Sequence, residues 1–469
     1  MSSEPSPLSP SAEEAPDWIL EVEGLGPIQR AVVEPAPLTI LVGDNNSGKS
    51  YLATLLWGLQ SELIDLLDAD TVAQQRESLK PCLRWLEALE LDAEPHQISE
   101  QEMRDLTTWA GDFLHGSGMA ALLNRAGYTP KRLELRRRSY VSRSKVQLHT
   151  TPRGQVLRAT RTGFGGASAP LDNKFIQRIE ARRFVAAYLA GERVASSRGP
   201  GYTSFLPASR TGFMLLRSQA TQAALQRSFG SEDSVERRLE RLSRPMLQLM
   251  QRLVTGFLGE KPGRFADEAK RLEESLRGEL VYRGAEVGLP EYLYRPAGTQ
   301  QELTMHASSS MVTELAPILL TLRFAPVLPF LVIEEPEAHL HPRVQRALAR
   351  TLVRLVRKGV RLVITTHSDL FCQQINNCIK LGERPTDERL ALQKRLGYSE
   401  DEYLRSGEVR GYGFSNLPDG SGSEVRELER SPYGLVMPTF NRELDALLAE
   451  TAQIDRAIPY RSEEMEPPP

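Results

Sequence analysis

The chain has 469 residues, enough for two or three domains or for one large domain with insertions. Its 58 basic and 61 acidic residues nearly balance, so the net charge of -3 gives no sign of a nucleic-acid or membrane partner. No apolar run approaches the roughly 20 residues that a membrane-spanning helix needs. The three cysteines have neither a disulfide-like nor a zinc-like spacing, which favours a reducing, cytoplasmic location.

The N-terminal half alternates between strand-like and helical patterns. Residues 1–17 are acidic and rich in Pro and Ser, which is typical of a disordered tail and not of a signal peptide. Residues 70–126 have a helical, acidic pattern. From Lys131 to Arg161 there are ten Lys or Arg residues and one acid, in a pattern that favours strands. The β-branched runs predict strands at Trp18–Glu23, Ile28–Val33 and Leu38–Val42, followed by a helix from Lys49 to about Leu67.

The C-terminal half begins with apolar residues at helical spacing between Val235 and Leu253, which predict an amphipathic helix kinked by Pro245. Two further strands and a helix at Arg442–Thr451 are expected near the end of the chain. The elements predicted between them are strands at Glu279–Arg283, Glu291–Arg295, Glu302–His306, Phe330–Ile333 and Val360–Thr365, and helices at Thr313–Arg323 and Arg343–Lys358.

The segment GDNNSGKS, Gly43 to Ser50, fits the pattern G-x-x-x-x-G-K-[ST] of a phosphate-binding loop. A predicted strand leads into it and a predicted helix leads out of it. Glycines let the backbone approach a phosphate, and successive N–H groups at the helix start favour an anion. Lys49 would reach the β- and γ-phosphates of ATP, and Ser50 would ligate Mg²⁺; the alternative is a glycine-rich turn that matches by chance. The residues expected to bind nucleotide here are Gly43, Asn45, Asn46, Ser47, Gly48, Lys49 and Ser50.

The stretch LVIEEPEAHLHP contains an apolar strand that ends on two adjacent carboxylates. Burying either is unfavourable unless a cation or hydrogen-bond donors compensate. We expect Glu334 to hold Mg²⁺ through water and Glu335 to orient or deprotonate the attacking water. The alternative is an exposed strand end that carries acids for solubility, which does not explain their position directly after a buried run.

A second strand, RLVITTHSD, ends on His367 in the same manner. The carboxyl ends of the strands form the ligand edge of an α/β sheet, so His367 would donate a hydrogen bond to the γ-phosphate. Such a histidine on its own is more often structural, but the two preceding motifs favour the catalytic interpretation.

These signals, in this order, resemble the ABC-type ATPase heads of the chromosome-maintenance, recombination-repair and OLD (overcoming lysogenization defect) families. The resemblance covers Trp18–Ser61 and roughly Leu303–Leu370, and EEPEAHLHP and TTHS are especially similar to the OLD-related group. It implies an α/β fold, a P-loop NTPase head with a mixed sheet, flanking helices, and helical and β insertions. Such heads dimerise head to tail around two ATP molecules, each between one subunit's phosphate loop and the other's signature motif.

The segment ASSSMVTEL stands where the resemblance places that signature. Ser308 and Ser309 would touch the partner's γ-phosphate, and Ser310 replaces the usual glycine, which makes slow or conditional hydrolysis plausible. The family usually has aspartate at Glu334, but a carboxylate remains. HLHP resembles the D-loop, where His339 and His341 would contact the dimer partner.

Two basic features leave alternatives open. Arg210, in FLPASRTGF, resembles a residue of defence-associated ATPases, where it would contact phosphate or couple an insertion to the site; a structural ion pair is an equal alternative. The basic block Lys131–Lys145 would track a nucleic-acid backbone, or it is a solvated hairpin or a surface for an acidic protein.

OLD nucleases carry a Toprim domain after the ATPase, and the residues after Ser368 offer no such constellation. They resemble the C-terminal part of stand-alone ATPases in anti-phage operons, such as the ATPase subunits of PARIS, Septu and some retron systems. This resemblance implies a sensor or scaffold that controls a separate effector protein, such as a nuclease. The other hypotheses are a DNA-repair or chromosome-maintenance ATPase that clamps DNA, and a nucleotide-gated scaffold with little turnover.

These inferences divide the chain into six parts. They are a disordered tail (1–17), the N-terminal lobe of the head (18–67), a helical and then basic β-rich insertion (68–230), a helical arm (231–278), the C-terminal lobe with signature, acidic strand and histidine (279–400), and a C-terminal extension and tail (401–469).

Overall fold

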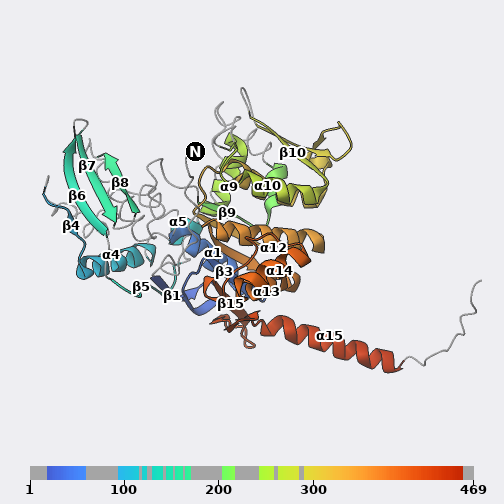
Figure 1. The fold of residues 1–469 in the computed structure, drawn as a ribbon. Coiled ribbons are helices and arrows are strands. Elements are labelled where there is room, and N and C mark those ends of the chain that lie inside the picture. Colours follow the sequence, from blue (N-terminus) through green and yellow to red (C-terminus); the bar gives the residue numbers. More distant parts are fainter. Residues whose placement is uncertain are drawn as a thin grey trace, which may run out of the picture.

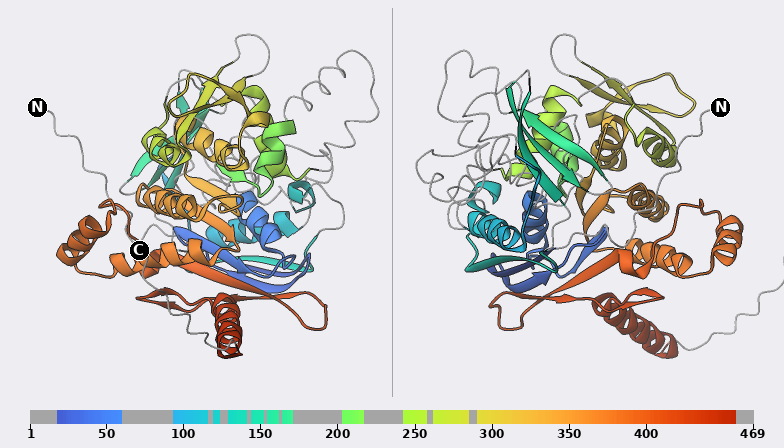
Figure 2. Two further views of the ribbon diagram at one scale, coloured as in Figure 1. Left: turned by 90° about the vertical axis from the view of Figure 1, so that its right-hand side faces the viewer. Right: turned by 60° about the vertical axis from the view of Figure 1, so that its left-hand side comes forward.

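A nine-stranded mixed sheet with helices on both faces forms the centre of the molecule, here a computed structural model (Figure 1 and Figure 2). The structure describes residues 18–59, 93–115, 119–123, 129–140, 144–151, 154–161, 164–170, 203–216, 242–257, 262–284 and 290–457. The strands, in spatial order, are β5 (Arg132–Arg137), β1 (Trp18–Leu25), β2 (Ile28–Val33), β16 (Ser423–Glu427), β15 (Val409–Asn416), β3 (Leu38–Gly43), β14 (Arg361–Thr366), β13 (Phe330–Glu334) and β9 (Ser204–Leu206). The α/β class expected from the sequence is confirmed.

One half of the sheet is parallel and the other half is mainly antiparallel. Strands β15, β3, β14, β13 and β9 run parallel to one another, whereas β5, β1 and β2 pair antiparallel. Strand β16 joins the halves, antiparallel to β15 and parallel to β2. The carboxyl ends of β3, β14 and β13 therefore meet at one edge, where an open α/β sheet binds its ligand.

The sheet is buried on both faces, which explains why its central strands are continuous apolar runs. Ile40 and Leu41 in β3 belong to different cores, and so do Ile333 and Val332 in β13, because successive side chains of a strand point to opposite faces. Helix α1 contributes to one core, and α11, α12 and α13 contribute to the other. The longer helices are α1 (Lys49–Trp57), α4 (Glu100–Phe113), α9 (Arg244–Thr255), α10 (Ala266–Glu273), α11 (Ser310–Phe324), α12 (Pro342–Arg357), α13 (Asp369–Gly382), α14 (Thr386–Leu396) and α15 (Pro438–Ala457).

Smaller elements surround this centre. The short helix α5 (Met119–Leu123) packs beside α1. The remaining strands form separate sheets: β4 (His96–Gln97), β6 (Ser144–Thr151), β7 (Gly154–Arg161) and β8 (Phe164–Pro170); β10 (Gly278–Arg283), β11 (Glu291–Pro296) and β12 (Leu303–Thr304); and β17 (Arg430–Ser431) with β18 (Gly434–Leu435). No helix of the described residues is both long enough and apolar enough to cross a bilayer.

Most predicted elements are present, two differ from the prediction, and parts of others lie outside the described residues. Helix α1 is observed as far as Trp57, and most of its expected continuation to Leu67 lies outside the described residues. Pro245 does not kink a helix: it lies in the first turn of α9, where its missing N–H would have no helical partner. The strand expected at Glu302–His306 is only the two-residue β12, followed by a 3-10 turn.

Residues 409–427, which the sequence places in a C-terminal extension, supply β15 and β16 to the middle of the sheet. Strand β15 pairs with β3 along its length, from Val409 opposite Leu38 to Phe414 opposite Gly43. The C-terminal part of the chain therefore lies directly beside the strand that leads into the phosphate loop.

Candidate active site

The predicted motifs converge at one edge of the sheet. The phosphate loop follows β3, His367 follows β14, and Glu334 and Glu335 end β13. Because β14 lies between the other two, with Thr365 opposite Glu334 and Thr366 opposite Val42, all three strand ends are neighbours. The structure thus brings together residues from both lobes of the sequence.

The phosphate loop owes its shape to its glycines. Gly43 has φ 137° and Gly48 has φ 97°, in the region that favours glycine. A Cβ on Gly43 would lie 2.0 Å from the carbonyl oxygen of Phe414, and one on Gly48 would lie 2.6 Å from Ile28. The hydroxyl of Ser47 donates to the carbonyl of Asp44 at 2.6 Å, which closes the turn. The loop therefore has the tight path that a phosphate cradle requires.

Lys49 lies inside this loop and is only 7% exposed. Its ammonium donates to the carbonyl of Gly43 at 3.0 Å and to that of Asp44. Burial lowers the pKa of Lys49 to about 8, although the nearby carboxylates of Glu335 and Asp44 act in the opposite direction. The ammonium also donates to the hydroxyl of Ser47 at 3.4 Å, so its hydrogen-bond acceptors are neutral oxygens, and this desolvated cation would gain strongly from a phosphate.

Glu334 is buried beside Ser50. Burial raises the pKa of Glu334. Hydrogen bonds from the Ser50 hydroxyl and from the Ala208 N–H, at 3.3 Å, lower this pKa and so act against burial. Its second carboxylate oxygen, Oε1, has no hydrogen-bond partner among the described residues. A serine hydroxyl beside an uncompensated buried carboxylate is a donor set that suits Mg²⁺.

Other metal chemistry finds no support in the described part of the chain. No group of three or more His, Cys, Asp and Glu side chains is arranged there to hold a metal ion. Magnesium differs from zinc in this respect, because it commonly keeps several waters and takes one or two carboxylates together with phosphate oxygens. The residues present therefore fit Mg²⁺ bound together with a nucleotide.

Glu335 has a left-handed backbone, with φ 43°, which is unusual for a residue other than glycine. The backbone N–H of Glu335 donates to the carbonyl of Thr365 at 2.8 Å. The Arg210 guanidinium donates to the backbone carbonyl of Glu335 at 2.9 Å. The carboxylate itself points outward: the side chain is 42% exposed, and Oε1 lies 3.8 Å from Nε2 of His367. A clamped backbone thus presents an open carboxylate beside the imidazole, a strained arrangement typical of functional sites.

His367 is half-buried at the same edge. Burial, followed by the positive charge of Lys49, lowers the pKa of His367, so the imidazole is neutral at pH 7. The backbone N–H of His367 donates to Oε1 of Glu337 at 2.7 Å, and the same carboxylate oxygen accepts from the Thr366 hydroxyl at 2.7 Å. Glu337 therefore holds the histidine turn. We assigned Glu337 no role from the sequence, although it is the third acid of EEPE.

Arg210 has the structural role that the sequence left open. It is fully buried, and its guanidinium forms an ion pair with Glu314 at 3.0 Å. It also donates to the carbonyls of Pro207, Glu334 and Glu335. In this buried position it fixes the end of β13.

The phosphate loop is also held from β15 and β16, which no sequence motif indicated. The N–H of Asn416 donates to the carboxylate of Asp44 at 2.8 Å, and its side-chain amide donates to the carbonyl of Asn45 at 3.0 Å. The hydroxyl of Ser423 donates to the carbonyl of Ser47 at 2.6 Å. These two residues position the loop from the opposite end of the chain.

The serines of the signature segment lie at the start of α11. Ser309 and Ser310 are exposed. The Ser308 hydroxyl donates to the carbonyl of Thr304 at 2.9 Å, and the Ser309 hydroxyl caps the helix by accepting from Val312. No hydrogen bond joins Ser308, Ser309 or Ser310 to the phosphate loop within the described residues. The three serines therefore lie at the N-terminal end of α11, and no hydrogen bond of the described residues links them to Lys49.

The D-loop histidines are exposed as well. His339 has φ 55°, and His341 is the N-cap of α12, where its ring accepts from the N–H of Arg343 at 3.3 Å. Both lie in the turn between β13 and α12, a few residues beyond Glu334 and Glu335.

The basic block is largely part of the central sheet. Its first strand, β5, pairs with β1, and there Arg136 forms an ion pair with Glu21. Arg132 pairs with Glu134, and Arg138 pairs with Glu34, beyond the end of β5. These carboxylates balance much of the positive charge that suggested a nucleic-acid track.

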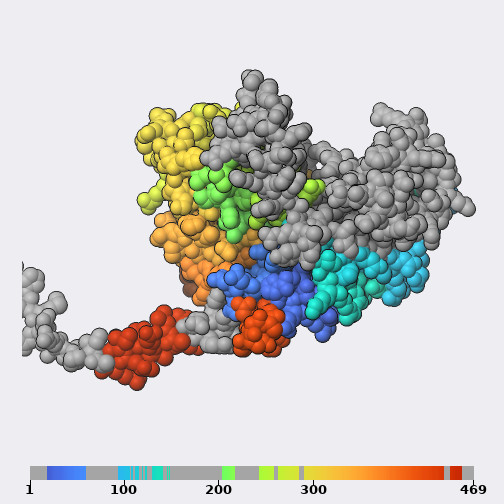
Figure 3. Space-filling view, turned by 180° about the vertical axis from the view of Figure 1, so that it is seen from behind, coloured from blue at the N-terminus to red at the C-terminus, as the bar shows by residue number. Residues whose placement is uncertain are grey.

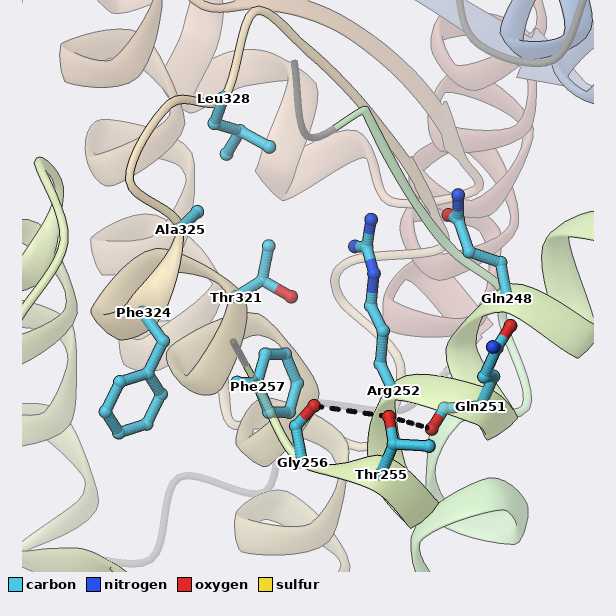
Figure 4. A pocket seen from close by; sticks show the side chains of 10 residues that line it. All are labelled: Gln248, Gln251, Arg252, Thr255, Gly256, Phe257, Thr321, Phe324, Ala325 and Leu328. Atoms are coloured by element: carbon cyan, nitrogen blue, oxygen red, sulfur yellow. Dashed lines mark hydrogen bonds between the residues drawn. The ribbon is translucent and has the colours of Figure 1, made fainter. Parts of the chain in front are cut away.

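Two cavities lie near the centre. One, of about 260 Å³, adjoins the candidate site and is lined by Ser50, Tyr51, Thr54, Phe205, Met246 and Glu334, among others. The other, of about 320 Å³, lies between α9 and the end of α11, with Arg252, Gln251, Thr321 and Phe324 around it (Figure 4). Its lining includes no residue of the phosphate loop or of the acidic strand end, so only the first belongs to this site.

Comparison with known proteins agrees with this geometry. Residues 229–373, which include the acidic strand and His367, match a family model described as "AAA domain, putative AbiEii toxin, Type IV TA system". No match to a curated protein is found. The phosphate-loop pattern, the acidic strand end and this match together support an ATPase domain of the AAA type.

Solved structures similar to the chain include heads of SMC proteins. An SMC head bound to the C-terminal winged-helix domain of ScpA aligns with 15% identity and a TM-score of 0.36, over 88% of this chain and 97% of that one. An SMC head with an extended coiled coil bound to the C-terminal domain of ScpA, from Pyrococcus furiosus, aligns with 13% identity and a TM-score of 0.36, over 92% and 98%. The SMC head of Thermotoga maritima aligns with 12% identity and a TM-score of 0.32, over 88% and 98%. The fold assignment itself rests on the sheet and the loop described above.

Proposed function

We propose that the protein binds and hydrolyses ATP with Mg²⁺. The observation that carries this proposal is that Glu334 and Glu335 lie at the mouth of the loop that holds Lys49. The carboxylate of Glu335 is close enough to oppose the lowering of the pKa of Lys49, and Ser50 hydrogen-bonds to Glu334. Residues far apart in the chain thus form one site with a cation, a metal-binding pair and an open carboxylate.

Each residue has a distinct role in this proposal. The N–H groups of the loop and the Lys49 ammonium bind the β- and γ-phosphates, and Ser50 and Glu334 hold Mg²⁺, Glu334 through water. When bound, Mg²⁺ neutralises charge on the transferred phosphoryl group. Glu335 accepts a proton from the attacking water, and neutral His367 donates a hydrogen bond to a γ-phosphate oxygen. The Arg210 contacts to the two backbone carbonyls keep Glu335 in place during this step.

We further propose a head-to-tail dimer. Ser308 and Ser309 lie at the exposed start of α11, so they are accessible to the γ-phosphate bound by a second subunit. His339 and His341 lie in the exposed turn after the acids, where they would contact that subunit. Two ATP molecules would then be enclosed between two copies of the chain.

The biological role that we propose is a sensor or scaffold subunit in anti-phage defence that controls a separate effector, such as a nuclease. The similarity to stand-alone defence ATPases supports this role, and the matched family's description, which names a putative toxin and a type IV toxin–antitoxin system, is in line with it. The ATP state of the head would hold or release the effector.

The decisive experiment measures ATP turnover and ATP binding by the purified chain. Glu335→Gln should lower kcat by about 10² to 10⁴ while ATP binding persists and the dimer is trapped. Lys49→Ala should abolish binding. Glu400→Gln makes the same chemical change at an exposed residue outside the site and should leave both unchanged. Unchanged turnover in Glu335→Gln would refute the assignment of the base.

Two alternative functions, a nucleotide-gated scaffold and a DNA clamp, predict different results with the same purified protein. A nucleotide-gated scaffold, favoured by the exposed Ser310 side chain at the start of α11, would bind ATP with no turnover that Glu335→Gln reduces. A DNA clamp would bind DNA in a salt-dependent manner that is lost when Arg136, Arg137 and Arg138 are neutralised. The ion pairs of Arg136 and Arg138 with glutamates make the clamp less well supported.

A further inference from the structure

Helix α15 (Pro438–Ala457) stands away from the body of the protein (Figure 1 and Figure 3). Every residue from Leu444 to Arg456 is exposed. An isolated helix of this length is marginal in water, because most helical stability in proteins comes from packing. A helix that is exposed on all sides therefore calls for an explanation.

One face of α15 carries a stripe of large aliphatic residues. Leu444, Leu447, Leu448 and Ile454 are 50%, 58%, 57% and 53% exposed. At 3.6 residues per turn they fall within an arc of about 120°, which is the width of a face that packs against another element. Scattered exposed leucines need no explanation, but a stripe at helical spacing is typical of an interface.

The base of this helix is firmly attached to the head. Leu435 and Met437, just before it, are buried in the core, and Tyr433 is exposed beside them. The side chain of Asn376 in α13 donates to the carbonyl of Leu435 at 3.0 Å and accepts from its N–H at 2.9 Å. The base of α15 is thus anchored to α13, the helix that begins directly after His367 and Ser368.

Charge decides what kind of partner suits the stripe. Asp455 falls inside the arc and Glu450 beside it, whereas Arg456 lies about 140° from its centre. A second copy of α15 would bring the same acids against each other, and like charges beside a seam disfavour pairing. An anionic membrane surface is disfavoured for the same reason. A partner helix with Lys or Arg beside its apolar residues complements both the aliphatic stripe and the two acids.

We propose that α15 is a docking helix for a separate protein, and that it binds an amphipathic helix with an apolar stripe flanked by Lys or Arg. The four aliphatic side chains supply the contact, while Glu450 and Asp455 select a basic partner. This interaction does not depend on nucleotide chemistry, so it stands or falls independently of the proposed ATPase activity.

The test uses two designed peptides of about 21 residues with Leu at the a and d positions of a heptad, one with Lys and one with Glu at e and g. Binding of each labelled peptide to the full chain is measured by fluorescence anisotropy at several salt concentrations. We expect the Lys peptide to bind more tightly than the Glu peptide. The double variant Leu447→Ser with Leu448→Ser should weaken Lys-peptide binding at least about tenfold. The Lys49→Ala variant should bind the Lys peptide as tightly as the parent chain does.

Charge reversal provides the matched control. In Glu450→Lys with Asp455→Lys the stripe is intact, so the preference should change to the Glu peptide. The four substituted side chains of α15 are exposed, so the thermal unfolding of these two double variants should match that of the parent chain. Equal binding of both peptides, or a preference that charge reversal leaves unchanged, overturns the proposal. Self-association without nucleotide, or binding to phosphatidylglycerol vesicles, that is lost in the serine variant overturns it as well.

Discussion

The hydroxyl of Ser423 donates a hydrogen bond to the carbonyl of Ser47 at 2.6 Å, and Ser423 is fully buried. A residue near the end of the chain thus supports the phosphate loop near its beginning. The carbonyl of Ser47 would otherwise lack this donor, and the loop would lose one of the contacts that fix its path. The candidate site therefore depends on β16 as much as on the motif itself.

Ser423→Ala should weaken ATP binding and destabilise the fold by about 1–2 kcal/mol, since it removes the donor from a buried acceptor. Fluorescent-nucleotide titration and urea unfolding measure the two effects. Ser421→Ala is the matched control, because Ser421 is exposed and its hydroxyl donates to Asp419 at 2.7 Å. If both variants behave alike, Ser423 does not position the loop.

ATP affinity should decrease as pH rises above about 8. Burial lowers the pKa of Lys49 to about 8 in the free protein, and a bound phosphate would raise it again. Binding therefore takes up a proton above that pH, and affinity falls by up to about tenfold per pH unit until the pKa of the complex is reached. Titrations from pH 7 to 10 measure this. Lys49→Arg should remove the dependence in that range; if it persists there, another group is responsible.

Glu334→Gln should stabilise the metal-free protein at neutral pH relative to the parent chain. Burial raises the pKa of Glu334 above its ordinary value of 4.5, so the folded state holds a proton that the unfolded state loses. The parent chain therefore loses stability as pH rises from about 4.5 through the raised pKa, and the variant does not. Urea unfolding between pH 5 and 7 should show a widening difference. The same variant should lose Mg²⁺-dependent ATP binding, whereas Glu400→Gln should change neither property.

Arg210→Met should destabilise the fold by about 3–5 kcal/mol, because it leaves the buried Glu314 without its ion-pair partner. Combining it with Glu314→Gln should recover part of that loss, which a double-mutant cycle in urea quantifies. Arg384→Met, at an exposed position, should change stability by less than about 0.5 kcal/mol. An Arg210 variant as stable as this control would contradict the structural role.

The positions of the three candidate-site motifs could be predicted because each is a local pattern. A strand, a glycine-rich turn and a helix start are consecutive in the chain around Lys49, and the same holds for the acids that follow β13. Helix positions followed from periodicity in the same way. Pro245 is the exception, since whether a proline kinks a helix or begins it depends on where the helix starts, which the repeat of apolar residues did not show.

The sequence by itself determined that the residues of the candidate site lie at the ends of buried strands, because strand and loop patterns are set by neighbours in the chain. Only the tertiary structure decided that β15 and β16 lie beside β3, that Asn416 and Ser423 hold the loop, and that Arg210 supports Glu335 from within the core. It also paired Arg132, Arg136 and Arg138 of the basic block with glutamates. Strand order and register arise from contacts between distant residues, and the spacing of residues along one segment carries no record of the segment that will pack against it.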